Sequence, residues 1–135
     1  MSIKKELSNL NEIFNLFEDP KEKFVQLMDM GKESKQMSKT EKVDKNKITG
    51  CTSQAWVIGK KSEDNTYTFK TDSDALIVKG LLIILETIFN GQSSKEILAI
   101  KSHDILIAIG LDKIITSQRT NGFSNAVIKI QKIVK

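Results

Sequence analysis

The chain has 135 residues, of which 39% are hydrophobic and 28% are charged, a length that suits one globular domain spanning residues 1–135. Its single cysteine, Cys51, and single histidine, His103, exclude a Cys/His zinc finger, a cysteine-ligated iron–sulfur cluster and an internal disulfide. Cys51 is therefore either a buried apolar side chain or the centre of the chemistry.

The net charge of +4 comes almost entirely from lysine, since Arg119 is the one arginine among 21 basic residues. Nucleic-acid-binding proteins rely on arginine for bidentate contacts, so we expect no nucleic-acid partner. The longest apolar run, residues 81–85, has five residues, too few to cross a bilayer. The first residues lack the apolar core of a signal peptide. We therefore expect no membrane association and a cytoplasmic location, where the thiol stays reduced.

Apolar residues at helical spacing predict a first helix that begins near Ile3 and stops before Asp19. Asp19 is expected to cap a second helix that has Pro20 at its first position, with Gly31 as the left-handed residue after its end. The lysine-rich segment 32–47 offers little to bury and is predicted to be a mobile connector.

Residues 54–60 and 66–71 are rich in β-branched and aromatic side chains and flank a turn-rich segment, which predicts an antiparallel hairpin. Residues 46–49 are expected to add a short third strand. The apolar run 75–90 is too long for a strand and is followed by Gly91, so it predicts a largely buried helix.

Three shorter helical patterns complete the chain. Ser93 and Glu96 are spaced as a capping box that opens a helix to about residue 100, residues 103–110 predict another, and the last begins near Ser117. Helices, then strands, then helices predict an α+β fold: a two-layer single domain with a small antiparallel sheet packed against helices.

Glycine and small polar side chains surround Cys51, namely Gly50, Thr52, Ser53 and Gln54. This setting favours an accessible turn over an apolar core position. Glycine permits unusual dihedrals and close backbone approach, while hydroxyl, amide and backbone N–H groups can stabilise a sulfur anion, the reactive form of a thiol. The residues alone leave a functional thiol and an inert one as equal alternatives.

Three motifs resemble the SufE family of sulfur-acceptor proteins over nearly the whole chain. They are Gly-Cys-Thr-Ser-Gln-Ala-Trp at 50–56, Asp-Ser-Asp-Ala-Leu-Ile-Val-Lys-Gly-Leu at 72–81, and Ser-Gln-Arg-Thr-Asn-Gly at 117–122. Two positions depart from the family pattern: Thr52 stands where glutamine is usual and Ala55 where valine is usual. Neither departure removes the thiol, but Thr52 has the shorter reach.

The resemblance implies a carrier that takes persulfide sulfur from a pyridoxal-phosphate cysteine desulfurase (SufS-like) onto Cys51, stimulates that enzyme, and passes the sulfur to an iron–sulfur scaffold (a SufB-containing complex). The carrier itself would bind no cofactor or metal. The pyridoxal phosphate belongs to the desulfurase, and the Cys51 persulfide is a transient intermediate. A monomer or a homodimer fits this role.

Several other residues receive expected roles. Gly50, Ser53 and Gln54 are expected to support the thiol loop, and Asp72 and Asp74 to position it or contact a partner, because antiparallel pairing brings the end of the hairpin back to it. Arg119 is expected to clamp Asp72, Asp74 or a nearby turn, with a partner acid as the alternative.

A labile persulfide should be shielded, and we expect an apolar pocket lined by Trp56 and the long helix to hold it. Trp56 is otherwise expected to be a packing anchor of the hairpin. Two other functions remain open from the residues: a stand-alone thiol enzyme such as a one-cysteine peroxidase, and a non-catalytic interaction module.

Overall fold

A computed structural model of the chain describes residues 2–50 and 53–135. Helices and a small sheet alternate along these residues, as the element order shows: α1 (Ile3–Asn15), α2 (Pro20–Glu33), the 3-10 turn η1 (Asp44–Asn46), β1 (Ala55–Lys61), β2 (Thr66–Ser73), α3 (Leu76–Phe89), β3 (Gln92–Ser93), α4 (Ser94–Leu98), α5 (Ser102–Ile109) and α6 (Ser117–Val134). The predicted α+β class is confirmed.

The sheet has the strand order β1-β2-β3, and both pairings are antiparallel. In the predicted hairpin, Ala55 lies opposite Ser73 and Lys61 lies opposite Tyr67. Its turn contains Asn65 with a φ of 65°, a conformation that asparagine tolerates better than most residues. The end of β2 therefore returns to the start of β1, which follows Gln54 and lies four residues after Cys51 in the sequence.

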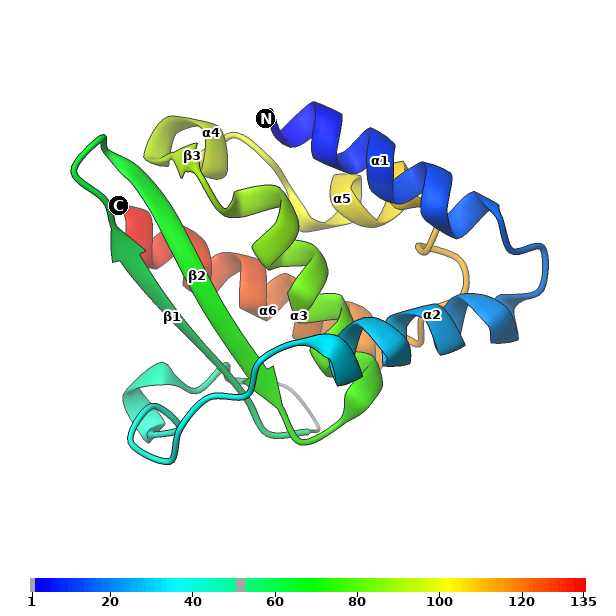
Figure 1. The fold of residues 1–135 in the computed structure, drawn as a ribbon, viewed down its shortest axis with the longest axis horizontal. Helices are drawn as coiled ribbons and strands as arrows, with labels where there is room; N and C mark the ends of the chain where they lie inside the picture. The colour runs from blue at the N-terminus through cyan, green and yellow to red at the C-terminus, as the bar shows by residue number, and fades with distance from the viewer. Residues whose placement is uncertain (1, 51–52) are drawn as a thin grey trace.

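Helix α3 lies at the centre of the fold, between the hairpin on one side and α1 and α2 on the other (Figure 1). Most of its residues are buried, because it contacts the sheet and three helices. Helix α6 packs on α3 and on β1, and its predicted apolar stripe is buried: Phe123, Ala126, Val127, Ile130 and Val134.

The predicted helix ends are confirmed where local chemistry sets them. The Asp19 side chain accepts a hydrogen bond from the Lys21 N–H with Pro20 at the first position of α2. Ser93 and Glu96 form the reciprocal capping box of α4, and Gly110 ends α5 in the left-handed conformation. Each of these signals depends on residues only a few positions apart, so it does not depend on the tertiary packing.

Two local predictions are wrong. Gly31 does not end α2 but lies buried within it, because the helix continues to Glu33 and passes close to α3 at this point. Residues 46–49 form no strand and contribute only a bridge between Lys47 and Trp56. The third strand is instead Gln92–Ser93, which pairs with the start of β2.

The segment 32–47, predicted to be a mobile connector, instead packs against the sheet. Met37 is buried, and Glu41 forms an ion pair with Lys70 at 3.0 Å. The sequence signal failed because this segment is held by ion pairs and backbone hydrogen bonds rather than by an apolar stripe.

Gly80 allows α2 and α3 to cross at close range. A Cβ at this position would lie 2.1 Å from the Leu27 carbonyl oxygen and 2.7 Å from its carbon, both backbone atoms of α2. A backbone neighbour cannot rotate away, so the helices would have to separate.

We predict that Gly80→Ala lowers the free energy of unfolding by about 2 kcal/mol, as overpacking does in well-packed cores. Chemical denaturation monitored by circular dichroism measures this. In an uncrowded helix the same change raises stability by about 1 kcal/mol, so a stabilised variant would contradict the close crossing.

Candidate functional site

Cys51 and Thr52 lie outside the described residues, and the site is built from what flanks them. The Ile48 N–H donates to the Ala55 carbonyl at 2.8 Å, and Lys47 bridges to Trp56. Ile48 and Ala55 are both buried. The chain therefore leaves and re-enters the sheet at one fixed point, and residues 49–54 lie between these two positions in the sequence.

Gly50, on one side of the cysteine, lies against α6. Its φ is +80°, and a Cβ there would lie 2.1 Å from Asn125 Nδ2. The backbone thus needs glycine for its conformation and for its approach to the helix. The residue that lies against Gly50, Asn125, was not indicated by the sequence.

Gln54, two residues after Thr52, is fixed to the end of β2. Its N–H donates to Asp74 Oδ1 at 3.1 Å, and its carbonyl accepts from the Asp74 N–H at 3.1 Å and the Ser73 hydroxyl at 2.8 Å. The structure thus brings Asp74 to the loop as predicted. Gln54 contributes its backbone to these contacts. Ser53, the other residue predicted to support the loop, is half-buried.

Asp72 is buried, with 1% of its surface exposed, and both of its carboxylate oxygens are occupied. Oδ2 accepts from the Met37 N–H at 2.9 Å and pairs with Lys42 at 3.1 Å. Oδ1 accepts from the Ser73 N–H at 2.8 Å and pairs with buried Lys79 at 3.1 Å. One carboxylate thereby joins the 32–47 segment, the end of β2 and the first turns of α3.

Burial alone would raise the pKa of Asp72, but the Met37 N–H and the Lys79 and Lys42 ammonium groups outweigh it and lower that pKa. On the other side of β2, Glu86 accepts hydrogen bonds from Thr71. Burial raises the pKa of Glu86, and the Thr71 hydrogen bonds offset only part of this. The two acids therefore respond to pH in opposite directions.

Trp56 lies opposite Asp72 in the hairpin register and is 7% exposed. The Lys42 ammonium stands 5.3 Å from its ring centroid, close enough for a cation–π contact. Trp56 is thus a buried anchor of the hairpin, as predicted, and the 32–47 segment lies over it.

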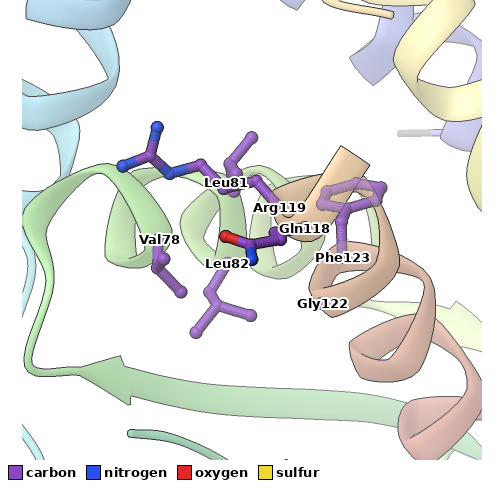
Figure 2. A pocket seen from close by; sticks show the side chains of 7 residues that line it. All are labelled: Val78, Leu81, Leu82, Gln118, Arg119, Gly122 and Phe123. Carbon is purple, nitrogen blue, oxygen red and sulfur yellow. The ribbon is translucent and has the colours of Figure 1, made fainter. Parts of the chain in front are cut away.

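An apolar pocket opens between α3 and α6 (Figure 2). Its cavity volume is about 20 Å³, and it is lined by Val78, Leu81 and Leu82 from α3 and by Gln118, Arg119, Gly122 and Phe123 from α6. A cavity of this size holds one water-sized group. The long helix lines this pocket, as expected of a shielding pocket, whereas Trp56 does not line it and lies beneath Lys42.

The predicted clamp between Arg119 and Asp72 or Asp74 is wrong, while a contact of Arg119 with a nearby turn or with a partner acid stays a prediction. Lysines occupy Asp72, and Asp74 accepts from the Gln54 backbone. Arg119 lies in the first turn of α6, where it lines the pocket, and its side chain extends toward α3 in Figure 2. A lone arginine in the sequence indicated a special position without indicating which one.

Lys79, Lys42 and Asn125 were missed as members of the site. Only Lys79 left a signal in the sequence, since it is the one charged residue within the apolar run 75–85. A cation inside a buried helix requires an acidic partner, and Asp72 is the acid it meets. Lys42 and Asn125 come from segments whose pattern says nothing about their contacts.

Among residues 2–50 and 53–135, no group of three or more His, Asp or Glu side chains is arranged to hold a metal ion. Within the same residues, no helix is long and apolar enough to span a membrane. His103 lies exposed in the first turn of α5.

The fold is a small α+β domain that fixes the described residues on either side of Cys51. The family described as "SufE: Fe-S metabolism associated domain" matches residues 8–134. The chain belongs to the SufE family, and the resemblance read from its three motifs is confirmed.

Similar proteins agree with this assignment. An uncharacterized SufE-like protein of Rhizobium meliloti is 32% identical over 93% of this chain and 91% of its own length. A SufE-like protein of Synechocystis is 36% identical over 88% of this chain and 74% of its own. A solved structure of a hypothetical protein from Thermus thermophilus covers 96% of this chain and 93% of its own with a TM-score of 0.75 at 17% identity, which supports the fold.

We predict that Asp72→Asn lowers the free energy of unfolding by about 3 kcal/mol at pH 7, because it leaves Lys79 buried beside a neutral amide. Asp74→Asn is the matched control. Asp74 is exposed, and an asparagine oxygen can still accept from Gln54, so this change should cost less than about 1 kcal/mol. Equal losses in urea denaturation would show that burial of the Asp72 network contributes nothing.

The pH dependence of stability gives a further test, with Asp72→Asn and with a second variant, Glu86→Gln. The pKa of Asp72 is lowered by folding, so its stabilisation is present at neutral pH and is lost as the pH falls below about 4. The difference in the free energy of unfolding between wild type and Asp72→Asn should therefore become smaller below about pH 4. The pKa of Glu86 is raised, so its contribution is lost as the pH rises above about 4. The free energy of unfolding of Glu86→Gln should therefore rise relative to that of wild type between about pH 4 and 7.

We predict that Gly50→Ala destabilises the chain more than Gly91→Ala does. Both glycines have a positive φ, +80° and +82°, but only Gly50 has a neighbour within 4 Å of its added Cβ. The conformational strain of about 1 kcal/mol is common to both, so the excess reports the contact with Asn125. In an Asn125→Ala background the two losses in thermal unfolding should become equal, and a persistent difference would place the cause elsewhere.

Proposed function

We propose that this protein is a sulfur carrier. Cys51 takes persulfide sulfur from a pyridoxal-phosphate cysteine desulfurase, stimulates that enzyme by clearing its product, and passes the sulfur to an iron–sulfur scaffold. Membership of the SufE family supports a role in iron–sulfur metabolism, and Cys51 is the chain's one thiol.

The observation that carries the proposal is the way the loop around Cys51 is held. Gly50 lies against α6, and Gln54 is hydrogen-bonded to Asp74 at the entrance to α3. The described residues on either side of the one thiol are thus both anchored, and Gly50 lies against α6, one of the two helices that form the apolar pocket. A cysteine without a function would not require a glycine beside it in a positive-φ conformation, nor a neighbouring backbone held by the Asp74 carboxylate.

The transfer is a thiol–disulfide type of exchange. The Cys51 thiolate attacks the outer sulfur of the donor's persulfide and forms a new S–S bond. The S–S bond of the donor breaks, and the donor sulfur leaves as a thiolate that takes up a proton. No net oxidant is consumed, since the sulfane sulfur keeps its oxidation state. A chain with one cysteine cannot resolve the product as an internal disulfide, so the sulfur stays available for the next acceptor.

The pocket between α3 and α6 suits the protection of such a sulfur. Its lining is mainly apolar, and its volume of about 20 Å³ accepts one atom the size of a water oxygen or a sulfur. A terminal sulfur placed there is kept from water and from stray thiols. Arg119 lies at the same pocket and would supply a positive charge to the persulfide anion.

The stable partners of this reaction are proteins rather than cofactors. Pyridoxal phosphate would stay with the desulfurase, while this chain holds sulfur covalently and only in passing. The scaffold would receive the sulfur by a second exchange of the same kind, in a reducing compartment such as the cytoplasm.

We predict that incubation with a cysteine desulfurase and cysteine adds one sulfur to the wild-type chain. Intact-mass spectrometry detects the added mass, and a thiol reductant removes it. Cys51→Ser should gain no sulfur and should lose the stimulation of desulfurase turnover, while its circular dichroism and its melting temperature stay close to those of wild type.

Trp56→Phe serves as a matched control, because it alters a buried side chain near the loop and keeps the thiol. It should still accept sulfur. Full stimulation by Cys51→Ser would refute the carrier role, and catalytic consumption of peroxide by wild type without a desulfurase would favour the one-cysteine peroxidase instead.

A further inference from the structure

The net charge of +4 hides an uneven distribution. Residues 45–54 and 113–135 together carry seven basic residues and no acidic residue. The rest of the chain carries 14 basic and 17 acidic residues, a net of −3. The excess of positive charge therefore belongs to two segments that are far apart in sequence, one of which contains Cys51.

The fold places these two segments side by side. The Lys129 ammonium of α6 donates to the Lys45 carbonyl of η1 at 3.0 Å, and Gly50 lies against Asn125, one helical turn before Lys129. Lys132 follows on the same face of α6 by helical spacing. Lys45, Lys47 and Lys132 are exposed, and Lys129 is half-buried. We call these four lysines the basic face.

Apolar side chains accompany the basic face. Ile128, which precedes Lys129, is 46% exposed, and Val43, which precedes η1, is 36% exposed. Asp44 at the start of η1 is the acid adjoining it in sequence, while Glu41 is paired with Lys70. Apolar groups next to a cluster of lysines are typical of a protein–protein docking surface, and Asp44 leaves the charge of this surface mainly positive.

We propose that the basic face is the surface on which the sulfur donor docks, through a complementary acidic surface around the donor's cysteine. This inference rests on the proposed function. Charges that surround a reaction point steer diffusional encounter and set the orientation of the partners. The basic face lies beside the anchored Gly50 flank of the thiol loop, so docking there brings the donor persulfide to Cys51.

A protein partner fits this face better than a nucleic acid does. All four of its charges are lysines, which bind as point charges and lack the planar fork that reads phosphate and base edges. No aromatic residue occurs in residues 45–54, and α6 has one, Phe123, which is buried. Stacking with unpaired bases, which single-stranded binders use, has no platform here.

The test is a matched pair of charge reversals. Lys47→Glu combined with Lys132→Glu changes the basic face, and Lys21→Glu combined with Lys101→Glu makes the same change of net charge elsewhere. All four lysines are exposed, and none forms an ion pair in the described residues. The measurement is the concentration of this chain that gives half-maximal stimulation of a cysteine desulfurase.

We predict an increase of about tenfold for the face variant and less than twofold for the control variant at 50 mM NaCl. At 500 mM NaCl the face variant and wild type should have similar half-maximal concentrations, because salt screens exposed charges. An equal shift in both variants, or no shift in the face variant, would overturn the proposal. So would tight binding of a 20-nucleotide RNA that only the face variant loses, since that result assigns the face to nucleic acid.

Glutathione persulfide separates this inference from the proposed function. As a small donor it needs no docking surface, so wild type and both variants should gain one sulfur at equal rates. If the face variant gains sulfur from glutathione persulfide more slowly than wild type, the substitutions have damaged the residues around Cys51. The tenfold increase in the half-maximal concentration would then count against docking. Full stimulation of the desulfurase by Cys51→Ser refutes the carrier role. Normal stimulation by the face variant refutes only the docking surface.

Discussion

The buried carboxylate of Asp72 is the contact on which the functional end of this molecule depends. It satisfies Lys79 in α3, Lys42 and the Met37 N–H in the 32–47 segment, and its own neighbour Ser73. Ser73 and Asp74 then bind Gln54. A charge that is costly to bury is retained here, and it fixes the strand end from which the thiol loop is held.

The thiol loop depends on two separate supports, and each comes from a different layer. Asp74, directly after β2, lies on one side, and Asn125 of α6 lies on the other. Helices α3 and α6 then enclose the apolar pocket between them. The described flanks of Cys51 therefore rest on rigid elements, which is how proteins give a loop both accessibility and defined geometry.

Local chemistry predicted most of the fold, and long-range pairing explains what was missed. Caps at Asp19 and Ser93 and the apolar stripe of α6 are each encoded within a few residues. The position of Gly31 inside α2 depends on α3, 45 or more residues away, which no local pattern contains. In the same way, the sequence indicated that Asp74 returns to residues near Cys51 but did not indicate the partner of Asp72, because the pairing of Asp72 with Lys79 depends on how α3 packs on the sheet.

Strand β1 is an edge of the sheet, and edges usually invite another strand to pair with them. Here the stretch of β1 beside the thiol loop is already engaged, because Lys47 bridges to Trp56 and Ile48 donates to Ala55. The far end carries Lys60 and Lys61, which discourage pairing. Both ends of this edge therefore disfavour recognition by strand addition, which leaves side chains to carry the specificity for a partner.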